Sequence, residues 1–261
     1  MKRKLWFIEI AVVISLMTLL SCEGPEGPAG PKGDTEVWVR AQVGPIYYWA
    51  DIPQVQVLVE NCPVIPTVTI NGDAVSYVPG AGIGEISASA SNLVFWLDYY
   101  YIDPGENVVL EINYEDDGEP KSINSSVIMP GETEFLNVSD TLFMEWQDDL
   151  ALTWATGENA SGYRFRAFYL FDLETATSTE SYSLTIDSVL TDTSIVIPAG
   201  TVYPDTTGMI GISLWHGSAA IKALDGPIAA GEPANITGDA SGYFYSYNFG
   251  DYVEIVLNTY P

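Results

Sequence analysis

Hydrophobic and polar residues alternate along most of the chain after residue 35, with a repeat of two rather than the spacing of a helix. Such alternation places one set of side chains in a core and the other in solvent, so it predicts β-strands. Asn71-Gly72, between two alternating runs, is a strong signal for a hairpin turn. The clearest strands predicted in this way cover residues 54–60, 67–70, 74–77, 93–98, 108–114 and 122–129.

Short strands that are broken regularly by Gly, Pro, Asn and Asp are typical of a β-sandwich. We therefore expect an all-β protein whose first sandwich spans residues 35–130 and ends at Pro130-Gly131. The same pattern continues through residues 131–261, which we expect to form a second sandwich in tandem with the first.

The second segment carries a more specific pattern. Leu150–Trp154 is followed by a polar turn and then by Tyr163-Arg164-Phe165-Arg166, and the two runs resemble strands B and C of a fibronectin type III domain. Residues 193–200 are similar to strand E of that family. The resemblance implies an immunoglobulin-like sandwich in which Trp154 and Tyr163 are core residues.

The first residues have the layout of a secretion signal. The basic residues Lys2, Arg3 and Lys4 precede an apolar run over residues 5–20, which is short for a membrane span and fits the hydrophobic region of a signal peptide. The run ends at Ser21-Cys22, which resembles the lipobox of bacterial lipoproteins. The resemblance implies that residues 1–21 are removed and that Cys22 carries the lipid anchoring the protein to a membrane of a bacterial cell envelope, the outer membrane or cell surface.

Residues 22–34 resemble a short piece of collagen. Glycine stands at every third position from Gly24 to Gly33, and proline follows it in three of the four triplets. In collagen only glycine fits at the crowded axis of three polyproline-II chains. Two interpretations stay open: a stiff single-chain stalk, or pairing of three chains through residues 24–35.

The charge and composition exclude several classes of function. The chain has 35 acidic and 9 basic residues, a formal charge of −26, so no surface could form the basic footprint of a nucleic-acid-binding protein. His216 is the single histidine, and no nucleophile motif accompanies it, so the sequence predicts that the protein is not an enzyme. Cys62, the second cysteine, is expected to be a buried structural thiol.

A tyrosine row is the first candidate site. Tyr243, Tyr245 and Tyr247 recur at every second residue, so a strand would carry all three on one face, with Phe244 on the other. Exposed rings in such a row suit stacking on sugars or docking of a protein. The preceding segment, residues 217–242, is rich in Gly, Ala and Pro and is expected to be a long loop beside this row.

Carboxylates form the second candidate site. Glu115, Asp116, Asp117 and Glu119 lie close together, and calcium prefers such oxygen ligands. The same residues include Asp117-Gly118, an ordinary hairpin turn signal. We expect no cofactor, with calcium at these four residues as the alternative.

These observations favour a non-catalytic cell-surface lipoprotein that presents β-sandwiches for adhesion or for binding a glycan or a protein. Two alternatives stay open: a structural subunit of a surface array or trimer, and a carbohydrate-binding accessory module. The expected partners are the membrane, through Cys22, and a glycan or surface-protein ligand.

Overall fold

The computed structural model describes residues 36–47, 50–79, 82–83, 86–87, 92–145, 148–199, 201, 209–227 and 234–257. In these ranges every regular element is a β-strand and no helix occurs, which confirms the prediction of an all-β protein. The described ranges contain no helix with the length and hydropathy that a membrane span requires. The predicted signal peptide, Cys22 and the collagen-like segment lie outside the described residues.

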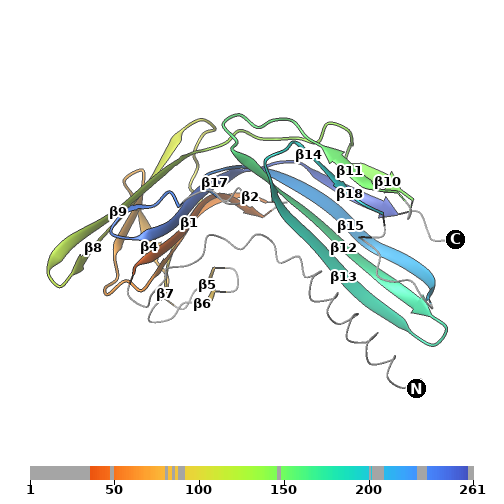
Figure 1. Cartoon of the computed structure of the whole chain (residues 1–261), viewed down its shortest axis with the longest axis horizontal. Helices are drawn as coiled ribbons and strands as arrows, with labels where there is room; N and C mark the ends of the chain where they lie inside the picture. Colours follow the sequence, from red (N-terminus) through yellow and green to blue (C-terminus); the bar gives the residue numbers. More distant parts are fainter. Residues whose placement is uncertain are drawn as a thin grey trace, which may run out of the picture.

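The strands form two layered bodies that meet at an angle, with one sheet continuing through both (Figure 1). This sheet contains fourteen strands, in an order that runs from β10 through β18, β15, β17, β1 and β2 to β9 and β16. A sandwich layout is therefore present, as the alternating sequence predicts.

The first sandwich packs two layers of antiparallel strands around an aliphatic core. Val57 on one layer and Leu110 on the other are fully buried in it, because each belongs to the apolar half of an alternating strand. One layer contains β1 (Trp38–Tyr47), β2 (Ala50–Glu60), β7 (Asn92–Asp98) and β4 (Asp73–Tyr77); the other contains β3 (Thr67–Ile70), β8 (Asn107–Asp116), β9 (Glu119–Ile128) and β16 (Thr237–Gly238). The short strands β5 (Gly82–Ile83) and β6 (Ile86–Ser87) pair with each other.

The second sandwich has an aromatic core. Trp154 is almost fully buried. Its ring stacks on the Phe165 ring, with 6.4 Å between the ring centroids, and forms an edge contact with the Tyr163 ring, with 5.7 Å between the centroids. The larger layer contains β13 (Thr179–Leu190), β12 (Gly162–Thr175), β15 (Met209–Asp225), β18 (Tyr252–Leu257) and β10 (Thr141–Met144). The smaller layer pairs β11 (Leu150–Thr153) with β14 (Ser194–Ile197).

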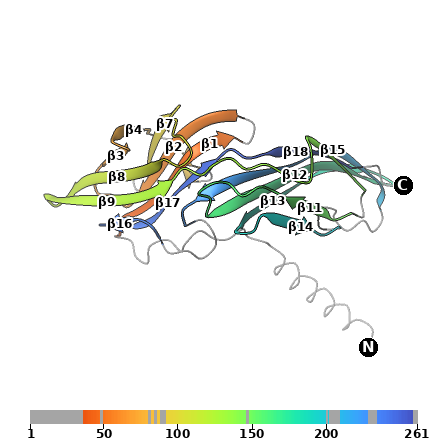
Figure 2. The same ribbon diagram turned by 90° about the horizontal axis from the view of Figure 1, so that it is seen from above.

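Strand β17 (Ser241–Asn248) joins the two sandwiches. It pairs in parallel with β1 over six residues and antiparallel with the end of β15, so one short strand belongs to both bodies (Figure 2). Phe244 and Ile236, from the C-terminal segment, lie in the core of the first sandwich. The chain leaves the first sandwich near the predicted boundary at residue 130, and Ile236 is the next described residue that lies in the core of this sandwich.

The approach of β17 to β1 requires a glycine. Gly242 has a φ of +140°, and a Cβ atom built on it would lie 1.9 Å from the carbonyl oxygen of Val39. A side chain at this position would therefore collide with the backbone of β1. The glycine lets the parallel pair form.

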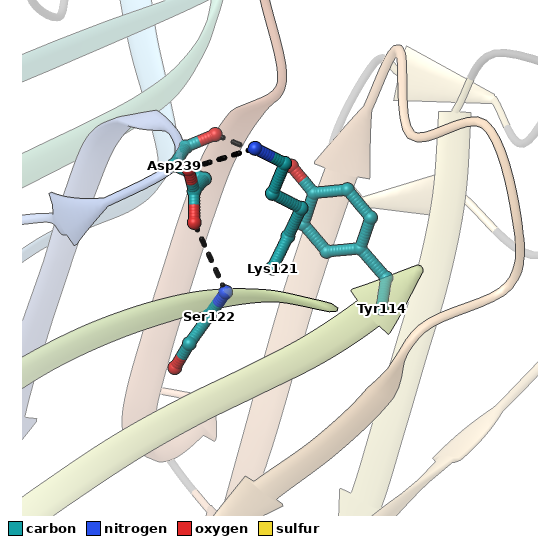
Figure 3. Close-up of polar contacts among 4 residues, drawn as sticks. All are labelled: Tyr114, Lys121, Ser122 and Asp239. Carbon is teal, nitrogen blue, oxygen red and sulfur yellow. Dashed lines mark hydrogen bonds and ion pairs between the residues drawn. The ribbon is translucent and has the colours of Figure 1, made fainter. Parts of the chain in front are cut away.

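Asp239 fixes the segment that leads into β17. Its carboxylate accepts hydrogen bonds from the Ser122 backbone N–H at 3.2 Å and from the Lys121 ammonium at 3.5 Å (Figure 3). Its carbonyl accepts a hydrogen bond from the Tyr114 hydroxyl at 3.3 Å. These contacts hold the C-terminal segment against β8 and β9.

The glycine- and alanine-rich segment 217–242 is not one long loop. Residues 217–225 continue strand β15, which runs between β12 on one side and β18 and β17 on the other. Ala219 and Ala223 face the core while Ala220 is buried on the opposite face. A strand buried on both faces has no polar alternation, so its sequence lacks the signal that identifies the other strands.

Candidate functional site

The candidate site lies on the face of the shared sheet that points away from the first core. Phe244 of β17 enters that core, so Tyr243, Tyr245 and Tyr247 project from the opposite face, as the two-residue repeat predicts. This face lies inside the bend between the sandwiches (Figure 1). We call it the inner face and define it by these three tyrosines, Trp38, Arg40, Gln42, Gln56, Trp96, Arg164, Arg166 and Lys222.

The tyrosine row is packed rather than open. Each of the three tyrosines is only 7–8% exposed, and neighbouring ring centroids lie 6.1 and 6.0 Å apart along the strand. Burial raises the pKa of Tyr243 and of Tyr245, so both hydroxyls stay protonated at neutral pH. The row therefore forms an aromatic floor, and more exposed side chains lie around it.

Four of the five basic residues after residue 35 lie on this inner face. Arg164 and Arg166 project from β12 in alternation with the core residues Tyr163 and Phe165, and Lys222 faces Arg164 across the β12–β15 pair. Arg40 projects from β1. The fifth, Lys121, lies on β9 and pairs with Asp239. In a chain with 35 acidic residues, this clustering makes the inner face the place where a negatively charged group would be attracted.

Arg40 is held between two aromatic rings. Its guanidinium carbon lies 5.4 Å from the Trp38 ring and 5.5 Å from the Tyr243 ring. The Nε atom of Arg40 is buried and has no hydrogen-bond partner. No ion pair to Arg40 occurs within the described residues.

Lys222 marks the other end of the row. Its ammonium lies 4.6 Å from the centre of the Tyr247 ring and donates a hydrogen bond to the carbonyl of Pro45 at 2.7 Å. Burial, and next the charge of Arg164, lower the pKa of Lys222 to about 7. Arg164 itself makes a bidentate pair with Asp187 through bonds of 2.9 and 2.7 Å.

A row of amides crosses the strands beside Arg40. The Tyr245 hydroxyl donates to the Gln42 side-chain oxygen, and the Gln42 amide donates to the Gln56 oxygen at 2.6 Å. Trp96 is the next residue in this cross-strand register, and its indole N–H donates to Asp98 at 2.7 Å. Gln42 and Trp96 are half-buried, so each keeps some exposed surface.

The carboxylates proposed for calcium lie elsewhere. Glu115 and Asp116 end β8, Glu119 begins β9, and Asp117 stands in the connecting turn with a φ of 51°; all four side chains are exposed. Among the described residues, no group of three or more His, Cys, Asp or Glu side chains is arranged to hold a metal ion. The hairpin turn accounts for the local sequence here.

Cys62 and His216 are the remaining candidate residues, and they lie far apart in the sequence and in different sandwiches. Cys62 is buried in the first core, and burial raises the pKa of its thiol. His216 is exposed on β15, with its Nε2 atom 3.5 Å from the Tyr252 hydroxyl.

The sequence predicted the shared face of the tyrosines but missed the basic residues around them. The missed signal is the alternation in Tyr163-Arg164-Phe165-Arg166 and in Trp38-Val39-Arg40. In both runs an arginine alternates with a core residue, which places the arginine on the opposite face of the sheet. No family model matches this chain, and a search of curated proteins also finds no match.

Proposed function

We propose that the chain is a non-catalytic lipoprotein of a bacterial cell envelope that binds an extracellular ligand on its inner face. The observation that carries the proposal is the gathering of Arg40, Arg164, Arg166 and Lys222 around a floor of aromatic rings. Rigid strands from both sandwiches position these side chains, which favours specific binding because little side-chain order is lost when the ligand arrives.

The segment before the sandwiches supports a surface location. The lipobox-like Ser21-Cys22 would attach the chain to a membrane, and residues 23–34 would hold the sandwiches away from it. The strongly acidic body would be repelled by anionic lipids, which also favours a protein that stands off the membrane.

The pairing order of the second sandwich supports an immunoglobulin-like domain of the fibronectin type III kind. Strands β13, β12, β15 and β18 lie in this order in one layer, and β11 pairs with β14 in the other. If β11 and β12 are taken as B and C, this is the arrangement expected of strands C′, C, F and G opposite B and E. Trp154 and Tyr163 lie in the core, where the resemblance places them.

The proposed function predicts that substitution of half-buried residues on the inner face weakens ligand binding. Trp96→Ala and Gln42→Ala should weaken binding of the purified chain to immobilised glycans or to purified surface proteins by about tenfold. Phe143→Ala is the control, because Phe143 is an exposed aromatic residue on the edge strand β10 and is not one of the residues that define the inner face. Equal binding by the inner-face variants and the wild type would contradict the proposed site.

The alternative of a surface array is favoured by one observation. Strand β13 is 12 residues long and, within the described residues, pairs only with β12. An edge of this length can add a strand from another chain. Replacing Thr185 on β13 by proline should lower the molar mass of the assembled protein in light scattering if this alternative holds, and should leave it unchanged if the chain acts alone.

A further inference from the structure

Arg40 has surroundings that suit an anion-binding residue. Its guanidinium lies between Trp38 and Tyr243, and its buried Nε has no hydrogen-bond partner. A buried polar atom without a partner is costly, so natural proteins seldom retain one unless it serves another purpose. The planar guanidinium matches a carboxylate, which can accept two of its N–H groups at once.

The acidic groups that share this face do not neutralise Arg40. Asp187 is engaged by Arg164 and Asp98 accepts the bond from Trp96. Glu60 is one strand away, opposite Trp38, and no ion pair joins it to Arg40. The carboxylate that would complete Arg40 is therefore absent from the described part of the chain.

The residues beside Arg40 suit a sugar. Gln42 is half-buried, and its side-chain amide has a second N–H and a second lone pair beyond its bonds to Gln56 and Tyr245, so it can both donate to and accept from a sugar hydroxyl. Trp96 adds a half-buried aromatic surface in the same cross-strand row. A carboxylate on Arg40 would place the attached sugar ring over this row.

The overall charge limits how acidic the ligand can be. A formal charge of −26 repels a long polyanion more strongly than a mostly neutral glycan, whose single carboxylate would lie beside Arg40. We infer that the inner face binds an oligosaccharide bearing an isolated carboxylate, such as a uronic or sialic acid residue, with the carboxylate on Arg40 and the neutral sugars on Gln42 and Trp96. This inference rests on the proposed binding function and names its ligand class.

Matched pairs of oligosaccharides test the inference by isothermal titration calorimetry of the purified full chain in detergent. The probes are 3′-sialyllactose against lactose, and a glucuronic acid-substituted xylo-oligosaccharide against its unsubstituted form. We expect the acidic member of at least one pair to bind about tenfold more tightly or better. Arg40→Gln should abolish this preference, Arg40→Lys should restore part of it, and Lys121→Gln should leave it unchanged.

Three results would overturn the inference. Equal affinity for the acidic and neutral members would show that the carboxylate is not recognised, while leaving the proposed binding function in place. Displacement of the acidic sugar by millimolar inorganic sulfate would show that Arg40 binds free inorganic anions and does not recognise a sugar carboxylate. Absence of binding to both members of every pair by a wild-type chain with a native circular dichroism spectrum would remove the glycan class, and the proposed function would then depend on a protein ligand whose binding Trp96→Ala weakens.

Discussion

The ammonium of Lys222 lies 2.7 Å from the carbonyl oxygen of Pro45 and donates a hydrogen bond to it. Lys222 belongs to β15 of the second sandwich and Pro45 to β1 of the first, so this single bond crosses the junction. The aromatic ring of Tyr247, from the strand shared by both sandwiches, lies beneath the ammonium. The junction is thus fixed by side chains as well as by strand pairing.

Stability should depend on pH through Lys222. Burial lowers its pKa from 10.5 to about 7, so between these values the unfolded chain binds a proton that the folded chain does not. The free energy of unfolding therefore rises as the pH increases from 7, while the cost of burying the charge is fully present below pH 7. Relative to Lys222→Met, the wild type should gain about 2 kcal/mol from pH 7 to pH 9 in urea unfolding. If the difference in the free energy of unfolding between the two proteins stays constant from pH 7 to pH 9, burial of Lys222 is contradicted.

Gly242 and Gly72 provide a matched pair for the β1–β17 contact. Both have positive φ, but a Cβ on Gly242 would strike the Val39 carbonyl, whereas a Cβ on Gly72 would meet nothing within 4 Å. Gly72→Ala should cost about 1 kcal/mol, from the backbone conformation alone. Gly242→Ala should cost about 3 kcal/mol or more, because strands β1 and β17 must separate. Similar losses in urea unfolding would show that β17 does not lie against β1.

Phe244 tests whether the C-terminal segment completes the first sandwich. Its side chain is fully buried in the first core, so Phe244→Ala should lower the free energy of unfolding by about 3–5 kcal/mol. Phe143→Ala should change it by less than about 0.5 kcal/mol, since Phe143 is 69% exposed. Hydrogen exchange of the β8 and β9 amides should accelerate in the Phe244 variant and stay unchanged in the control. Unchanged exchange in both variants would place Phe244 outside this core.

Cys62 should be unreactive in the folded protein. It is buried, and burial raises the pKa of its thiol, so little thiolate is present at pH 8 to attack a reagent. In a Cys22→Ser variant, reaction with Ellman's reagent should be at least about 100-fold slower in buffer than in denaturant. Rapid labelling of the native protein would contradict the buried position.

The alternating sequence predicted much of the fold because strand periodicity is a local property. The runs at residues 54–60 and 108–114 lie within β2 and β8, and the run at residues 122–129 overlaps β9 as far as Ile128. The parallel pairing of β1 with β17 could not be predicted, since it joins residues about 200 positions apart and parallel pairing leaves no turn signal between its strands. Strand β15 near Ala219 shows no alternation of apolar and polar residues, because both of its faces are covered there.

The candidate site was predicted only in part for a similar reason. The two-residue spacing of Tyr243, Tyr245 and Tyr247 predicted their common face, because spacing alone determines it. Their low exposure depends on how side chains of Trp38 and Leu224 pack around them, which comes from other parts of the chain. The convergence of Arg40 with Arg164 depends on the same long-range pairing.

The proposed function requires that the sandwiches be held at a cell envelope through Cys22. Intact mass spectrometry of protein extracted from membranes tests this most directly, because cleavage and lipidation both change the mass. We expect a mass equal to residues 22–261 plus two or three acyl chains, and loss of the ester-linked chains after mild alkaline treatment. A mass equal to all 261 residues, or to a shorter chain without lipid, would contradict the envelope lipoprotein.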